Sequence, residues 1–88
     1  MCTYSTELVE VRASAKGAAG WFPATSASVY VDHPVDFPAG HAVMIDVLNV
    51  ARGAHDRVGL EMDARSARLL AEAILRTLDS VPAGLLEE

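Results

Sequence analysis

Residues 57–82 read RVGLEMDARSARLLAEAILRTLDSVP, and the hydrophobic period changes in the middle of this stretch. Before Asp63 the apolar side chains alternate with others, as they do on a strand that buries one face. After Asp63 they recur at spacings of three and four, which predicts an amphipathic helix over residues 64–80. Asp63 is a suitable N-cap and Pro82 a suitable stop signal. The predicted apolar stripe of this helix consists of Ala67, Leu70, Ala71, Ile74, Leu75, Leu78 and Val81.

Three further segments upstream of residue 57 show the same strict alternation, namely residues 6–13, 27–32 and 41–48. Glycine and proline mark the connections between the strands, which we predict at residues 16–23, 33–40 and 49–56. We therefore predict a single β-β-β-β-α domain over residues 1–88. Its fold class is α+β, a four-stranded antiparallel meander with one C-terminal helix packed on one face of the sheet.

One helix can cover only one of the two sheet faces. We expect it to cover the face that carries Val29, Val31, Val43 and Ile45. Antiparallel sheets tolerate one face in water, but a small domain with a limited core often completes itself by pairing with a copy. We therefore expect a homodimer. The face left bare would carry Leu8, Tyr30, Met44 and Leu48 beside Glu10, Asp32, Asp46 and Glu61.

Composition excludes several classes of protein. The chain has 88 residues, of which 51% are hydrophobic and 22% charged, and this balance is typical of one folded domain. A formal net charge of −5 disfavours nucleic acid as a partner. No apolar run approaches the roughly 20 residues of a membrane span, so a membrane is not expected either. With one cysteine and no secretory signal pattern, the expected location is cytoplasmic.

A simple meander brings reactive side chains from distant parts of the chain to one edge of the sheet. Cys2 and Tyr4 lead into the first strand, whereas His33 ends the second and His41 opens the third. The two imidazoles are expected on the helix side, close to the cross-strand spacing of about 5 Å. One thiolate and two imidazoles suit Zn²⁺ or another divalent metal and leave a fourth position open. We therefore predict Cys2, His33 and His41 as metal ligands.

Further residues support this site in the same prediction. The supporting carboxylates are Asp32, Asp36 and Asp63, and the residues assigned to line a pocket are Tyr4, Trp21 and Phe22. Strand parity carried back from Val9 puts Cys2 on the face opposite the histidines. A bulge or other departure near Tyr4 is therefore required for the cysteine to join them.

Several interpretations of this edge stay open at the level of sequence. In the first, the Cys/His cluster binds a divalent metal or a small molecule, with metal-assisted or acid–base chemistry as an extension. A metal-free version uses the thiol as a nucleophile, including an amino-terminal cysteine exposed by removal of Met1. In another, both histidines are strand-end residues bonded to loop backbone. The alternative function is a non-catalytic homodimeric interaction module that uses the uncovered sheet face. Whether the protein is an enzyme is not decided.

Four segments carry a likeness to a known family, namely MCTYSTE (residues 1–7), GAAGWFP (17–23), VDHP (31–34) and SARLLAEAI (66–74). Together they resemble a family of small actinobacterial proteins of unknown function that begin Met-Cys-Thr-Tyr. The resemblance spans nearly the whole chain, and the use of arginine for six of the seven basic residues fits a GC-rich genome. It implies a short soluble protein and brings no activity with it.

Overall fold

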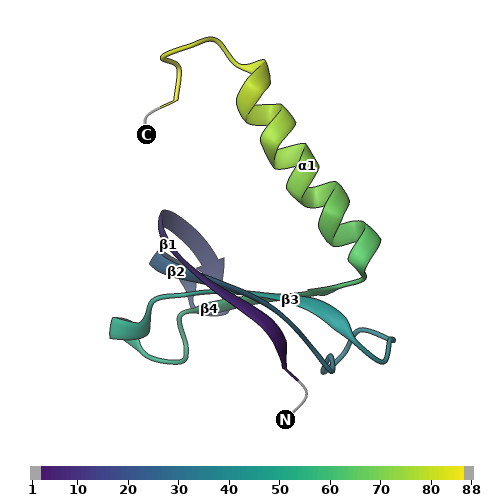
Figure 1. Ribbon diagram of the computed structural model, residues 1–88. Helices are drawn as coiled ribbons and strands as arrows, with labels where there is room; N and C mark the ends of the chain where they lie inside the picture. Colours follow the sequence, from purple (N-terminus) through teal and green to yellow (C-terminus); the bar gives the residue numbers. More distant parts are fainter. Residues whose placement is uncertain (1–2, 87–88) are drawn as a thin grey trace.

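The computed structural model describes residues 3–86, and the elements follow the predicted order. The four strands form one antiparallel sheet in the order β1-β2-β3-β4, and the helix follows β4 (Figure 1). The predicted α+β meander with one C-terminal helix is therefore confirmed. The elements are β1 (Tyr4–Gly17), β2 (Gly20–Asp32), β3 (Ala42–Leu48), the 3₁₀ turn η1 (Val50–Arg52), β4 (Arg57–Met62) and α1 (Ala64–Ser80).

The connection between the first two strands is far shorter than the predicted loop over residues 16–23. β1 and β2 pair as far as Gly17 and Gly20, which leaves a two-residue turn. Gly20 has φ +115°, a conformation that L side chains rarely adopt. Phe22, expected in a loop, is a strand residue with only 3% of its surface exposed. The loop prediction is wrong because the aromatic and its neighbours extend the hairpin and fill the core.

One face of the sheet, called here the core face, holds most of the buried side chains. The end of the β1–β2 hairpin curls toward β4, and a Cβ on Gly17 would lie 3.3 Å from the Phe22 ring and 3.4 Å from the carbonyl oxygen of Arg57. The side-chain amide of Asn49 donates to the carbonyl oxygen of Pro23 at 2.7 Å, which ties the hairpin to the β3–β4 connection. The buried residues of this face are Phe22, Ala24, Ala42, Met44 and Asp46.

The opposite face, called here the bare face, is apolar across three strands but is not covered. Its members are at most partly buried, and Leu60 is 47% exposed. This is the reverse of the expected assignment, in which the helix covered this face and the other one was bare. The expectation is wrong because the end of the long β1–β2 hairpin covers the core face, whereas the helix covers neither face. The bare face consists of Val29, Val31, Val43, Ile45, Val47, Val58, Leu60 and Met62.

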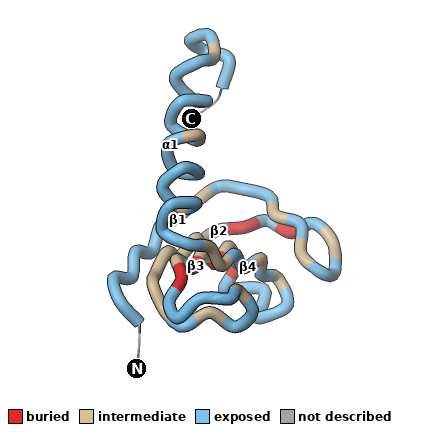
Figure 2. Tube along the Cα trace, turned by 90° about the vertical axis from the view of Figure 1, so that its right-hand side faces the viewer, coloured by how far each residue is buried: buried red, intermediate tan, exposed pale blue. Residues whose placement is uncertain are grey.

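The helix α1 does not pack on the sheet, so this part of the prediction is also wrong. Only Asp63 separates β4 from α1, and its carboxylate accepts a hydrogen bond from the backbone N–H of Ser66 at 2.7 Å. The helix therefore starts at once and extends away from the strands (Figure 1). No residue of Ala64–Ser80, all of which are described, is buried, and Figure 2 shows α1 as exposed along almost its whole length.

The overall dimensions agree with a projecting helix. The radius of gyration is 14.5 Å, whereas a compact domain of this length has about 12 Å. The principal extents are 43 × 32 × 20 Å. Within residues 3–86, no helix combines the length and the apolar character needed to cross a membrane.

Candidate functional site

The predicted edge of the sheet does bring the two histidines together. Tyr4 lies opposite Val31, and Asp32 lies opposite Ala42, so the start of β1, the end of β2 and the start of β3 share one edge. The ring centroids of His33 and His41 are 4.3 Å apart, with 35° between the ring planes. The ring of Tyr4 meets His41 edge-on at 5.6 Å. We call Tyr4, His33 and His41 the histidine edge.

His33 is held by the loop that follows it. Its ring Nδ1 lies 2.7 Å from the carbonyl oxygen of Gly40. Because a carbonyl oxygen only accepts, Nδ1 must carry the proton. A neutral His33 ring therefore presents the lone pair of Nε2. Metal-binding histidines commonly donate their second ring nitrogen to a backbone carbonyl in this way.

Asp32 ties the beginning of the described chain to this edge. Its carboxylate accepts a hydrogen bond from the Thr3 hydroxyl at 2.6 Å and another from the backbone N–H of His33 at 2.7 Å. The Thr3 bond, followed by the His33 bond, lowers the pKa of Asp32 below its ordinary value. This bond holds Thr3 against Asp32, the residue that directly precedes His33.

The irregularity that the sequence required near Tyr4 is present. The register between β1 and β2 shifts between Tyr4 and Glu7, and Ser5 has φ +51°. Residues directly opposite each other on neighbouring strands share a face. Tyr4 therefore belongs with Val31 on the bare face, to which the histidines' parity also assigns them. Cys2 itself lies outside the described residues.

Other residues assigned to the site have different positions. The Asp63 carboxylate caps α1, and the capping bonds from Ser66 lower its pKa. Trp21 is 70% exposed and Phe22 is buried, and both lie at the hairpin end of β2, remote from His33. Within residues 3–86, no group of three or more His, Cys, Asp or Glu side chains is placed to hold a metal ion. The described part of the edge thus contributes two imidazoles.

Glu61 organises the loop that carries Gly40, a role the sequence did not reveal. Its carboxylate accepts backbone hydrogen bonds from Val35 at 2.5 Å, from Asp36 at 2.9 Å and from Phe37 at 2.9 Å. The bonds from Phe37, Val35 and Asp36, in that order, lower the pKa of Glu61. Three converging N–H groups hold a carboxylate in its charged form. Glu61 and the Gly40–His33 bond therefore both restrain the connection between β2 and β3.

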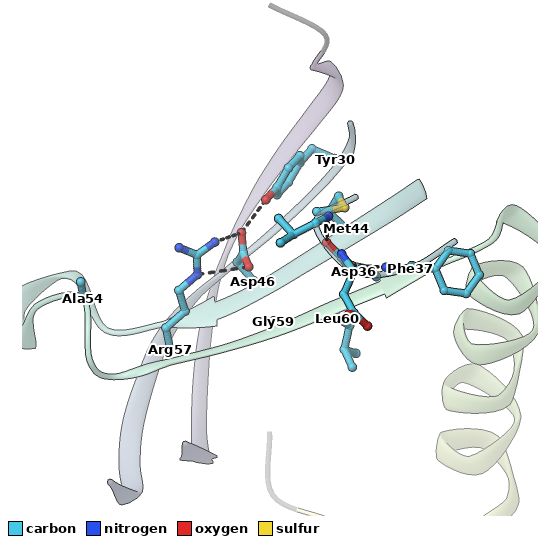
Figure 3. A pocket seen from close by; sticks show the side chains of 11 residues that line it. Tyr30, Asp36, Phe37, Met44, Asp46, Ala54, Arg57, Gly59 and Leu60 are labelled. Atoms are coloured by element: carbon cyan, nitrogen blue, oxygen red, sulfur yellow. Dashed lines mark hydrogen bonds and ion pairs between the residues drawn. The ribbon is translucent and has the colours of Figure 1, made fainter. Parts of the chain in front are cut away.

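A second feature is an open pocket of about 690 Å³ on the core face (Figure 3). Among its lining residues, the Asp46 carboxylate accepts a hydrogen bond from the Tyr30 hydroxyl at 2.7 Å and forms an ion pair with Arg57 at 2.8 Å. The bond to Asp46 is the main cause that raises the pKa of Tyr30 and also that of Arg57. The pocket is lined by Tyr30, Val35, Asp36, Phe37, Met44, Asp46, Ala54, Arg57, Gly59, Leu60 and Glu61.

The Tyr30–Asp46–Arg57 network was missed by sequence reasoning, although one signal was available. Asp46 lies opposite Gly59 in the β3–β4 register, and a Cβ on Gly59 would come within 3.3 Å of the Asp46 carboxylate. A glycine opposite an inward aspartate is a sign that the carboxylate needs the space. Asp46 and Arg57 neutralise each other, so this network stabilises the sheet. The pocket lining keeps two further carboxylates, those of Asp36 and Glu61.

Comparison with known proteins gives one match. The model of a family of unknown function (DUF6295) matches residues 1–87. No curated protein and no solved structure matches the chain. These comparisons assign no function, so a proposal about function has to rest on the chemistry of the chain's own residues.

Proposed function

The chain belongs to the DUF6295 family, whose function is unknown, and we propose that it binds a divalent metal ion, with Zn²⁺ the best fit, through His33, His41 and Cys2. The observation that carries this proposal is the pair of imidazoles whose ring centroids are 4.3 Å apart, one directly after β2 and the other directly before β3. Imidazole and thiolate are the ligands that zinc prefers, and two nearby histidines form half of a tetrahedral set. We propose that the protein acts in the cytoplasm of an actinobacterium. A single cysteine stays reduced in that compartment.

The hydrogen bonding of His33 supports the same proposal. With Nδ1 donating to Gly40, the ring orientation is fixed and Nε2 is free to act as a ligand. Glu61 restrains the loop that carries Gly40, so the acceptor is itself held in place. A preorganised ligand loses less conformational entropy when the metal binds.

The bulge near Tyr4 bears on the third ligand. Regular alternation from Val9 would separate Cys2 from the histidines, but the register shift places Tyr4 on their face. The first strand therefore begins on the face of the histidines, two residues after Cys2 in the sequence. The Thr3–Asp32 bond anchors the neighbouring residue beside His33. These observations support Cys2 as the third ligand, and Asp32 as a carboxylate that orients the chain rather than the metal.

A metal with three protein ligands keeps a fourth position for water or a small molecule. A zinc-bound water is a stronger acid than bulk water, which would give this edge hydrolytic or acid–base chemistry. Such chemistry is an extension of metal binding in this proposal.

Metal content of untagged protein after exhaustive dialysis tests the proposal. We expect close to one zinc per chain, and at least a tenfold weaker affinity after His33→Ala, His41→Ala or Cys2→Ser, since each removes one ligand. His55→Ala is the matched control, because His55 is exposed in the connection before β4. Metal-free wild-type protein that also fails to take up added Zn²⁺ would refute metal binding.

A second candidate function, a protein-interaction module that self-associates, is favoured by a different observation. α1 is amphipathic, yet large apolar side chains on its stripe are about half exposed, among them Ile74 at 53% and Leu78 at 53%. An amphipathic helix ordinarily buries its apolar stripe against another element. The expected homodimer stays a proposal, now with the helix and the bare face as its surfaces. Light scattering tests it, and a mass near 9.3 kDa at high concentration would exclude it.

A further inference from the structure

Within residues 3–86, no other element covers the helix α1, and none of its residues is buried. On its apolar stripe, Leu70 has 41% and Leu75 has 62% of its surface exposed, in addition to the half-exposed Ile74 and Leu78. A shallow hollow on the helix surface is lined by Ala73, Ile74, Thr77 and Leu78. Exposure of contiguous apolar side chains on this scale is typical of an interaction surface.

The connection to β4 keeps α1 from covering its own sheet. Asp63 is the only residue between Met62 and Ala64, and its side chain caps the helix. A helix that folds back over the strand from which it emerges needs a loop of several residues, commonly two to six. With a single capping residue, the direction of α1 is set by the end of β4 and leads away from the sheet (Figure 1).

The bare face of the sheet is the complementary surface. It presents Val43, Ile45 and Val47 of β3 at its centre, flanked by apolar residues of β2 and β4. Four strands spaced about 4.8 Å apart are roughly 14 Å wide between the outer axes. A helix of 17 residues is about 25 Å long, which is enough to cross them. Each chain thus carries a helix without a sheet and a sheet face without a helix.

Charge also favours a second copy as the occupant. α1 carries three arginines (Arg65, Arg68, Arg76) against Glu72 and Asp79. Residues 1–63, which contain the whole sheet, have eight acidic side chains against four basic ones. The net charge of α1 is thus opposite in sign to that of residues 1–63 as a whole, which attracts the helix to a second copy at long range. On the bare face itself the acidic side chain is Glu7, opposite Val29, whereas Glu10, Asp46 and Glu61 lie on the core face.

We propose that two copies of this chain exchange their C-terminal helices, so that α1 of each copy lies across the bare face of the other. This proposal rests on the self-association put forward as the second candidate function, and it names the partner and the geometry. The dimer is isologous, because one two-fold axis generates both helix–sheet contacts at once. Exchange covers both unpartnered surfaces and leaves the core face and the histidine edge of each copy unchanged.

The first experiment compares two charge insertions on opposite sides of α1. Ile74→Asp places a carboxylate in the stripe, whereas Leu69→Asp places one on the other side of the helix, at a leucine that is 51% exposed. We expect Ile74→Asp to raise the dimer dissociation constant at least about tenfold, because a buried unpaired charge is costly, and Leu69→Asp to leave it nearly unchanged. Circular dichroism verifies that both variants are folded. Equal effects of the two variants would contradict an interface on the stripe.

The second experiment traps the contact. In a Cys2→Ser background, a chain with Ile45→Cys on the bare face is mixed with a chain that has Ile74→Cys on the helix, and the mixture is oxidised. Exchange predicts a disulfide-linked heterodimer. Leu60→Cys, at a half-exposed position of the same face, replaces Ile45→Cys if that variant does not fold.

The outcomes separate exchange from self-association in general. If Ile74→Cys alone forms a linked homodimer with higher yield than the mixture, the helices pair with each other; exchange is then wrong although self-association holds. If a chain with both cysteines forms only an internal disulfide, α1 folds back on its own sheet and exchange is wrong. A monomeric wild-type protein at millimolar concentration overturns both exchange and self-association.

Discussion

The core face and α1 contain the same kinds of side chain in opposite surroundings. On the core face, Phe22 is 3% and Met44 8% exposed, and Asp46 is paired with Tyr30 and Arg57. Among the described residues, every buried side-chain nitrogen or oxygen has a hydrogen-bond partner. On α1, by contrast, Leu70, Ile74 and Leu78 are all more than 40% exposed. The described chain buries the core face with its own residues and leaves the apolar stripe of α1 exposed.

The difference shows that hydrophobic patterning alone does not bury a surface. α1 has as clear an apolar stripe as any strand has an apolar face, but a segment is buried only where the chain can bring a second layer over it. A hairpin of two long strands can curl over the sheet because it bends along its length. A helix that starts one residue after a strand has no such freedom.

Truncation of a core-face residue should have the largest effect. We expect Phe22→Ala to lower the free energy of unfolding by about 3 kcal/mol, because a buried aromatic ring is removed and a cavity remains. Trp21→Ala, at the neighbouring exposed position, should cost less than about 1 kcal/mol. Urea denaturation measures both, and similar losses at the two positions would contradict the assignment of the core face.

Acid should weaken the hydrogen bonds between Glu61 and the loop of residues 35–37. We expect this loss of stability to be smaller than that of Phe22→Ala. The pKa of Glu61 is lowered on folding, so the stabilisation from its charged form is present above the ordinary glutamate pKa of 4.5 and is lost as the pH falls through the lower folded value. The melting temperature of the wild type should exceed that of Glu61→Gln at pH 7, and the two should converge as the pH falls below about 4.

The matched control for this pH dependence is Glu72→Gln on the exposed side of α1. It removes the same charge without removing the three backbone hydrogen bonds. A wild-type advantage over Glu61→Gln that stayed constant from pH 7 to pH 2 would show that the carboxylate does not act through its charge.

Truncation on the helix should have the smallest effect in dilute solution. Ile74→Ala removes a side chain that is 53% exposed in the single chain, and alanine favours a helix. At concentrations where the chain is monomeric, we expect a change of less than about 0.5 kcal/mol in the free energy of unfolding. If copies exchange helices as proposed, the loss should grow at high protein concentration. Chemical denaturation at two protein concentrations measures both values, and a large loss at the lower concentration would show that α1 is already packed.

Part of the histidine edge could be predicted because it depends only on strand order. Once the four strands form a meander, His33 and His41 must lie at the same edge, whatever covers the sheet. Parity alone also shows that Cys2 could join the histidines only through a bulge or other departure near Tyr4. The Glu61 contacts could not be derived in this way, because they depend on how the loop of residues 33–41 bends back toward β4, and no periodic pattern encodes that path.

The sequence by itself determined the order of the elements, the side-chain parity of β3, β4 and the second half of β2, and the capping of α1 by Asp63. These features depend on local propensities and on periods of two and 3.6 residues, which are visible in a few consecutive residues. The parity predicted for residues 6–13 does not hold along the whole of β1, because the register with β2 shifts between Glu10 and Ala13. Only the tertiary structure decided which face is buried and where the helix points. Both sheet faces carry enough apolar side chains to be a core, so the choice between them depends on the curl of the β1–β2 hairpin and on the one-residue connection at Asp63. Both are constraints on the path of the backbone in space, and they cannot be predicted from the alternation of apolar and polar side chains.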